Sequence, residues 1–414
     1  MRRVVLCLCF AVSAGGLVPS LAAQTVHRLA PADRRVTIAS EIVYRVGGIA
    51  AEPWASFGRI DQVGFDGGGR LYVLDGQNQR LVVVGPSGEL IRTIGRRGSG
   101  PGEFQAPRRM FVLSDGGVVV HDVVRRNFQR FGPDGALLGE AQQPRELGSP
   151  NGFAMLGPTT AFATPRLVVV DGSLALATDL DGGAPTEIPL YRVELADGGK
   201  ATRIGGAWVA PRPARGPFSP HAFAPQLHWA QVGSRIAIVD SVTYDVRVID
   251  ESGSVVARLR RPLEPREPTR ADRERARAEA RERFISPEGQ PRVVGAVSGG
   301  GGGDAGGRGD VMRRIEQGLR DMTFAERIPV VLGLRGDMDA RLWITRAAPT
   351  WGDAGPVDLV RLDGRYIGTV NAPGFRVPDA FGPRGLAAYI EADELETPVV
   401  VVRRIGIEEP SAGR

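Results

Sequence analysis

The sequence predicts an all-β fold: a six-bladed β-propeller closed by an N-terminal strand, with a small helical insertion between blades four and five. Three observations predict this fold. A unit of about 47 residues recurs along the chain, each copy reads as four short antiparallel strands, and the 56 glycines and 31 prolines suit many tight turns. The 414 residues, 42% of them hydrophobic, are enough to bury a large core.

The chain begins with a segment typical of a secretory signal peptide, which we predict over residues 1–23. Arg2 and Arg3 precede the apolar run VVLCLCFAVSAGGLV, and small residues follow it near Ala22 and Ala23. The run is short for a membrane span. We therefore expect an exported protein, periplasmic or extracellular, whose mature chain has no transmembrane segment; a retained N-terminal anchor is the alternative.

The composition argues against several functional classes. Cys7 and Cys9 both lie inside the predicted signal, so the mature chain has no cysteine for a disulfide, a nucleophile or a metal site. The net charge of +5 is the small difference between 52 basic and 47 acidic residues. Such a balance differs from the concentrated basic face of a nucleic-acid-binding protein, so we expect no nucleic-acid partner.

The clearest copies of the repeat are LYVLDGQNQRLVVVGPSGELI, VVVHDVVRRNFQRFGPDGALL and IAIVDSVTYDVRVIDESGSVV. In each copy an apolar strand ends in an aspartate (Asp75, Asp122 or Asp240), a polar loop follows, and the next strand runs into a tight turn. Both alternating faces of LYVLD are apolar, which predicts a strand buried on both sides. Four-stranded sheets packed face to face around an axis satisfy that requirement.

Weaker copies fill the rest of the chain, beginning at Gly172, Ala340 and Gly385. In the first two of these copies, Thr178 and Arg346 stand where the clear copies have the aspartate. The last copy supplies only the final two strands of a blade. The segment SEIVYRVG, residues 40–47, aligns with the fourth strand of the first copy, so we predict that it completes the last blade and closes the ring.

Residues 262–325 interrupt the strand pattern. PTRADRERARAEARERF predicts a helix that Thr269 caps, with Asp272 three residues further on. A glycine-rich linker and a second short helix with apolar residues at helical spacing follow. We therefore predict a propeller over residues 36–405 that contains this helical and Gly-rich insertion.

The first copies resemble the NHL-type repeat. LYVLDGQNQRLVVVGPSGELIRTIGRRGSGPGEFQAPRRM contains that repeat's glycine-and-phenylalanine link into a proline, followed by a strand and then by an aspartate that closes the next strand. The mature chain is similar to exported bacterial six-bladed propellers of the NHL-like and TolB-like kind. The resemblance implies the fold, but function does not follow from this fold.

Candidate site residues lie on the predicted innermost strands and on the links between blades. For a ligand or partner face we select Asp61, Arg96, Arg97, Arg108, Arg109, Gln226 and His228. The arginines could pair with an acidic partner, or the whole set could simply be solvated around a water-filled channel. For a structural role at repeat positions we select Asp75, Asp122, Asp240, Phe57 and Phe104.

The glycine-rich stretch GRRGSGPGEFQAP is predicted to be a connector between blades. It lacks the Lys-Ser or Lys-Thr pair of a phosphate-binding loop, and it leads into a strand where a dinucleotide loop would open a helix. We expect its glycines to permit the turn and Phe104 to pack between blades.

We therefore predict an exported binding or scaffold protein that recognises a protein, peptide or glycan through its blade-linking loops. The alternative is a metal-dependent enzyme, either a calcium lactonase or a lyase. PNGFAMLGP resembles an Asn-Gly motif of the lactonases through Asn151 and Gly152, and a lyase would use His228 and His121. The chain has four histidines, no HxH or HExxH spacing and few asparagines. We therefore predict no catalytic residue, no metal site and no cofactor.

Overall fold

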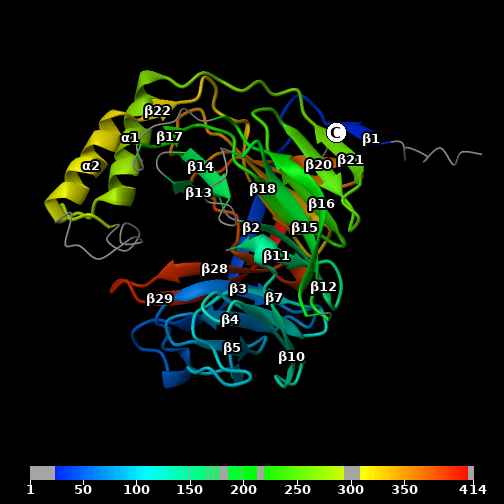
Figure 1. Ribbon diagram of the computed structural model, residues 1–414. Helices are drawn as coiled ribbons and strands as arrows, with labels where there is room; N and C mark the ends of the chain where they lie inside the picture. Colours follow the sequence, from blue (N-terminus) through cyan, green and yellow to red (C-terminus); the bar gives the residue numbers. More distant parts are fainter. Residues whose placement is uncertain are drawn as a thin grey trace, which may run out of the picture.

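The computed structural model describes residues 24–148, 150–165, 167–170, 173–176, 185–196, 198–211, 219–292 and 308–408. The fold is mostly β, with two helices (Figure 1). The predicted signal peptide and Thr178 lie outside the described residues.

In four blades, the four strands follow one another in the sequence and are neighbours in the same order in the sheet. Blade one is β3 (Ile60–Phe65), β4 (Leu71–Asp75), β5 (Arg80–Val84) and β6 (Leu90–Ile94). Blade two is β7 (Pro107–Val112), β8 (Val118–Asp122), β9 (Asn127–Phe131) and β10 (Leu137–Gln142). Blade four is β18 (His228–Val232), β19 (Arg235–Val239), β20 (Asp245–Ile249) and β21 (Val255–Arg260). Blade five is β23 (Val331–Gly336), β24 (Arg341–Arg346), β25 (Val357–Arg361) and β26 (Tyr366–Val370). Every residue of β4 is buried, as its two apolar faces predict.

Blade three differs from the prediction. Its strands are β11 (Pro150–Met155), β12 (Thr160–Pro165), β15 (Glu187–Glu194) and β16 (Lys200–Trp208). The segment after Gly172, predicted as the second strand, instead forms β14 (Ser173–Leu176), which pairs with β13 (Leu167–Val170) in a separate hairpin. The prediction was wrong because two short apolar segments compete for one place, and TAFATP, which is joined to β11 by a short turn, takes it.

Blade six combines the two ends of the chain and is joined through β2 to blade five in one eight-stranded sheet. It contains β27 (Ala380–Phe381), β28 (Leu386–Ala392), β29 (Pro398–Glu408) and, as its outer strand, β2 (Arg35–Gly47), which pairs antiparallel with β29. The first residues of β2 also pair with β26, and β1 (Thr25–Arg28) lies parallel to β21. We call residues 25–47 the N-terminal strap, because they contact the outer strands of blades four and five and form the outer strand of blade six.

The segment between β21 and β23 contains α1 (Arg270–Phe284) and α2 (Arg308–Arg320), which lie side by side (Figure 1). Thr269 caps α1 in a capping box with Asp272, as predicted. Flanking the helices, β17 (His221–Ala222) pairs with β22 (Thr323–Phe324). Neither of these helices, nor any other in the described chain, is long and apolar enough to cross a membrane.

Connections between strands alternate between two faces of the molecule, because neighbouring strands run antiparallel. Short turns join first to second and third to fourth strands on one face. The other face carries the loops between second and third strands and the links between blades, including short 3-10 helices at Pro53–Ala55 and Arg145–Leu147. A third 3-10 helix, Pro383–Gly385, joins β27 to β28 and so belongs to the first face. We call this other face the connector face; it includes residues 48–59, 76–79, 95–106, 347–356 and 371–379.

Candidate functional site: the central channel

The innermost strands of all six sheets surround one cavity of about 1120 Å³. Each sheet contributes wall residues, for example Gln62, Arg109, Phe153, His228, Leu334 and Phe381. Connector-face loops at residues 352–355 and 374–377 complete the wall, so the cavity extends to that face. A volume of this size is large enough for a ligand.

Glutamine side chains join the inner strands of neighbouring blades. Gln62 Nε2 donates to the Met110 carbonyl (2.8 Å), and the Met110 amide donates back to Gln62 Oε1 (3.0 Å). Gln231 Nε2 donates in the same way to the Met155 carbonyl (2.5 Å). These bonds satisfy backbone groups that the open edge of an inner strand would otherwise leave unpaired, so they fix the channel wall.

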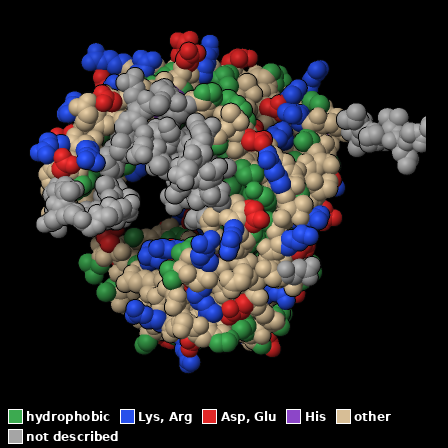
Figure 2. Space-filling model, viewed as in Figure 1, with side chains coloured by type: hydrophobic (Ala, Val, Ile, Leu, Met, Phe, Trp, Pro, Cys, Tyr) green, Lys and Arg blue, Asp and Glu red, His purple; other side chains and the backbone are tan. Residues whose placement is uncertain are grey.

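Three arginines and two aspartates line the channel, and both aspartates are already paired. Asp379 accepts from Arg376 Nη1 (2.8 Å), and Asp353 accepts from Arg275 Nη1 of α1 (2.6 Å). Arg335 of β23 is exposed to the channel and has no ion pair within the described part of the chain. On the face seen in Figure 2, Lys and Arg side chains border a hollow. The wall can therefore attract an anionic group.

His228 lies in the channel wall, as predicted, at the start of β18. Its side chain is half-buried, and this burial lowers its pKa. The imidazole is consequently neutral at neutral pH, where it can donate one hydrogen bond and accept another.

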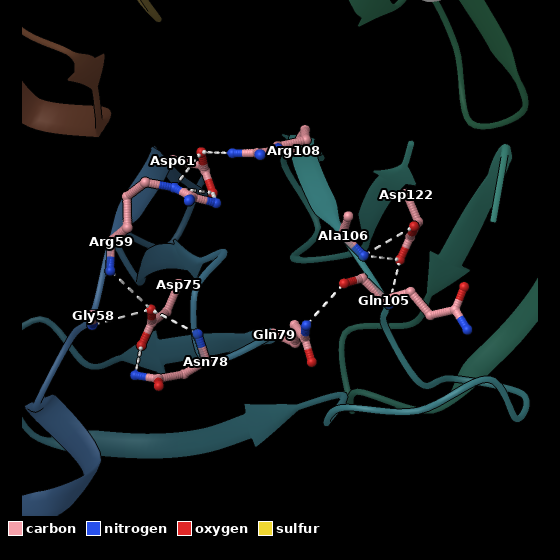
Figure 3. Close-up of polar contacts among 10 residues, drawn as sticks. All are labelled: Gly58, Arg59, Asp61, Asp75, Asn78, Gln79, Gln105, Ala106, Arg108 and Asp122. Carbon is pink, nitrogen blue, oxygen red and sulfur yellow. Dashed lines mark hydrogen bonds and ion pairs between the residues drawn. The ribbon is translucent and has the colours of Figure 1, made fainter. Parts of the chain in front are cut away.

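Asp61 and Arg108 occupy matching positions on β3 and β7, and the structure brings them together. Arg108 Nη1 lies 3.2 Å from Asp61 Oδ1, and Arg59 also pairs with Asp61 at 3.0 Å (Figure 3). These two predicted partner residues therefore neutralise part of each other's charge.

The other predicted face residues do not line the channel, apart from Arg109. Arg96 donates to Glu103 Oε1 (2.8 Å), and this bond, together with a backbone bond from Gly100, lowers the pKa of Glu103. Arg97 is exposed on the same link between blades one and two. Gln226 is exposed beside a smaller chamber next to the channel.

Two of the repeated aspartates hold the links that enter their blades. Asp75 accepts from the Gly58 amide (3.3 Å) and from Asn78 Nδ2 (2.7 Å). Asp122 accepts from the amides of Gln105 (2.7 Å) and Ala106 (3.0 Å), as Figure 3 shows. The carboxylates thus tie each incoming link to the following turn, which is a structural arrangement.

Asp240, the third repeated aspartate, has different contacts. It accepts from the Trp208 amide (2.7 Å) and pairs with Arg247. It therefore binds the end of the preceding blade's outer strand. Among the described residues, it makes no hydrogen bond to the turn that follows it, residues 241–244.

The phenylalanines of the links are buried. Phe57 is 4% exposed and Phe104 is fully buried, with its ring edge-on to Phe131 at 5.8 Å. Gly95 has a φ of 74°, and a Cβ there would lie 2.2 Å from the Phe104 ring. Gly95, the first glycine of GRRGSGPGEFQAP, is therefore required both by its backbone conformation and by the close approach of Phe104.

Sequence reasoning missed Arg335. Because β23 and β24 have the same register as β3 and β4, Arg335 corresponds to Gly64 of the first blade. Aligning the fifth copy with the first at this position would have revealed a charge within an inner strand, one residue before its end.

The alternative of a metal-dependent enzyme requires a metal site. Among the residues that the structure describes, no group of three or more His, Cys, Asp or Glu side chains could hold an ion. His121 is buried, and its Nε2 lies 2.7 Å from Gln143 Oε1. The side chain of Asn151 is outside the described part.

Sheets arranged around a central channel define the class: this is a β-propeller. The family model DUF5128, described as a 6-bladed beta-propeller, matches residues 55–147, which cover blades one and two. The six-bladed prediction is therefore confirmed. No curated protein matches the chain.

Solved structures resemble the chain over most of its length. A member of the DUF4221 family from Bacteroides vulgatus has a TM-score of 0.52 and 12% identity, covering 91% of this chain and 99% of its own. A Bacteroides fragilis protein named as a "putative exported protein" has a TM-score of 0.49 and 11% identity, covering 92% of this chain and 100% of its own. A gluconolactonase from Xanthomonas campestris has a TM-score of 0.38 and 13% identity, covering 93% and 98%. At these identities the likeness concerns the fold alone.

Proposed function

We propose that the protein is an exported propeller of the NHL-like or TolB-like kind, with its ring closed by β2, and that it binds an acidic protein segment, peptide or glycan in its channel. The ligand enters from the connector face. The observation that carries this proposal is the state of the channel charges: both lining aspartates are ion-paired, whereas Arg335 has no acidic partner among the described residues.

The position of Arg335 strengthens its attraction for an anion. A cleft with low-dielectric walls focuses the field of the charges that line it and favours ligands of the opposite sign. Arg109 adds a second exposed guanidinium to the same wall. Guanidinium groups bind carboxylates, and the sulfates or uronates of glycans, through parallel hydrogen bonds.

The connector face suits ligand entry because it carries the longest segments of the chain on a rigid β scaffold. The helical segment between blades four and five lies there, as do the channel-lining loops at residues 352–355 and 374–377. The opposite face carries turns of a few residues.

Binding of labelled acidic peptides tests the proposal. Fluorescence anisotropy of a hexaglutamate probe with the mature protein should show binding that weakens as salt rises from about 0.05 to 0.5 M, because added ions screen the attraction. A hexalysine probe should not bind. Arg335→Gln should weaken hexaglutamate binding about tenfold, the loss of roughly 1.4 kcal/mol.

Arg270→Gln is the matched control, because Arg270 is 92% exposed on α1 and is not among the channel residues. It should bind the probe as the unchanged protein does. Equal loss in both variants, or binding of hexalysine and hexaglutamate alike, would contradict a channel site for anions.

A further inference from the structure

A second chamber of about 230 Å³ lies beside the channel, between α1 and the start of blade four. His228 and Leu332 line both spaces, so the chamber adjoins the channel at these two residues. Whole-ligand pockets usually have volumes of about 300–1000 Å³. The chamber is smaller, and its size suits one end group of a larger ligand.

The chamber walls carry both apolar and polar side chains. From α1 come Ala276 and Ala280, which are 4% and 6% exposed, and opposite them lie Phe223, Met322 and Trp351. His221, Gln226 and His228 add polar groups to the walls, as do Glu279 and Arg283 on the exposed side of α1. A ligand group that lies against Ala276, Ala280 and Met322 therefore meets carbon, with polar groups elsewhere in the same chamber.

Specific contacts hold α1 over the chamber. The Trp351 amide donates to Asp272 Oδ1 (2.8 Å), and Trp351 Nε1 donates to Glu279 Oε2 (2.9 Å). Arg275 pairs with Asp353, which itself lines the channel. These contacts thus connect the α1 wall of the chamber to the loop that lines the channel.

We propose that the chamber anchors one bulky apolar side chain, aromatic or aliphatic, of an acidic peptide whose carboxylates lie along the channel near Arg335. This inference rests on the proposed function and narrows its ligand to a peptide. The neutral imidazole of His228, placed where the two spaces meet, can bond the peptide backbone between the two groups.

The apolar part of the wall favours a peptide side chain over a sugar ring at that place. A sugar ring there would bring hydroxyl groups against Ala276, Ala280, Met322 and Leu332, which offer no hydrogen bonds from their side chains. Unpaired buried hydroxyl groups weaken binding. A phenylalanine or leucine side chain brings no such groups and gains from leaving water.

Two Glu-rich hexapeptides that differ only by a central Phe or Ala test the anchor. The mature protein should bind the Phe peptide about tenfold more tightly, the effect expected for burial of one large apolar side chain. Ala280→Leu, which fills the chamber, should remove this advantage while leaving the Ala peptide unaffected. Ala278→Leu makes the same change on the exposed side of α1 and should retain the advantage.

A photoreactive benzoylphenylalanine in place of the Phe provides a second measurement that needs no variant, in case Ala280→Leu disturbs the fold. It should crosslink to α1 or to residues 220–228. Equal binding of the two peptides, or crosslinks elsewhere, would overturn the anchor while leaving the channel proposal standing. If neither peptide binds, the proposed function fails as well. If an oligouronate binds and Ala280→Leu abolishes its binding, the ligand is a glycan and the peptide inference is wrong.

Discussion

Arg346 ends β24 at the place where Asp75 ends β4, since each pairs with the first residue of its blade. The substitution of an arginine for the repeated aspartate changes what this position binds. Arg346 lies 3.2 Å from Asp358 Oδ1 and 2.7 Å from Asp33 Oδ2. Arg261 completes the cluster through bonds to the same two aspartates, at 2.8 and 2.7 Å.

Asp358 is the centre of this cluster and is fully buried, as is the side chain of Arg261. Asp358→Asn should lower the free energy of unfolding by about 3–5 kcal/mol, because it leaves buried guanidinium charge without its counter-charge. Urea unfolding at neutral pH measures the change. Asp363→Asn, in an exposed turn of the same blade, is the control and should cost less than about 1 kcal/mol. Equal, small losses in both variants would contradict a stabilising role for the cluster.

At the residue scale, the sequence predicts what recurs and misses what depends on distant segments. Asp75 and Asp122 could be selected because the same residue returns at the same place. Asp33 could not be matched to Arg346, because 313 residues separate them and no repeat relates them. Arg335 was missed for a similar reason, since its importance appears only when six inner strands share one channel.

At the scale of elements, the N-terminal strap connects three blades. β1 pairs with β21, the start of β2 pairs with β26, and the rest of β2 pairs with β29. Between the strands, the Ala30 carbonyl accepts from Arg261 Nε (2.8 Å). The strap therefore covers outer edges that would otherwise be open to pairing with other chains.

The strap should loosen in acid through Asp33. Burial alone would raise the pKa of Asp33, but hydrogen bonds from Arg346 and Arg261 outweigh it and hold the pKa below its usual value. A depressed carboxyl pKa contributes stability above the unfolded value, near pH 4, and that stability is lost as the pH falls through the folded value. The Asp33→Asn variant should therefore be less stable than the unchanged protein at pH 7. The loss should be only about 1 kcal/mol, because the Asp33 side chain is 43% exposed and solvent weakens its ion pairs.

Urea unfolding at pH 7 and at about pH 3 measures this effect. The stability difference between Asp33→Asn and the unchanged protein should shrink as the pH falls below the unfolded pKa of about 4, and it should vanish only below the lowered folded pKa, where Asp33 is protonated in both folded and unfolded chains. A difference that stays constant across this range would show that the carboxylate charge is not what holds the strap.

Local signals determined which elements could be predicted. The helix at residues 270–284 followed from its capping residues and charge pattern, and β4 followed from its two apolar faces. The second strand of blade three was misplaced because periodicity cannot choose between two apolar segments of similar length. The strand β1 has four residues and no partner nearby in the sequence, so nothing local predicts its pairing with β21.

At the scale of the whole molecule, the chain separates stability from binding. Repeated strands build propeller blades whose buried faces pack on one another, for example through Phe104 between blades one and two. On the connector face, the described parts of the longer links border the channel and the smaller chamber. The repeats predict the ring because they are local and recurrent, but the site is composed of the residues in which the blades differ.

Hydrogen exchange of the mature protein, with and without the Phe-containing acidic peptide, tests most directly whether the ligand binds in the channel from the connector face. Bound peptide should slow amide exchange in β23 and in the loops at residues 349–355 and 371–379, and should leave the outer strands β6 and β10 unchanged. Slower exchange confined to those outer strands, or to the short turns of the opposite face, would contradict the channel as the binding site.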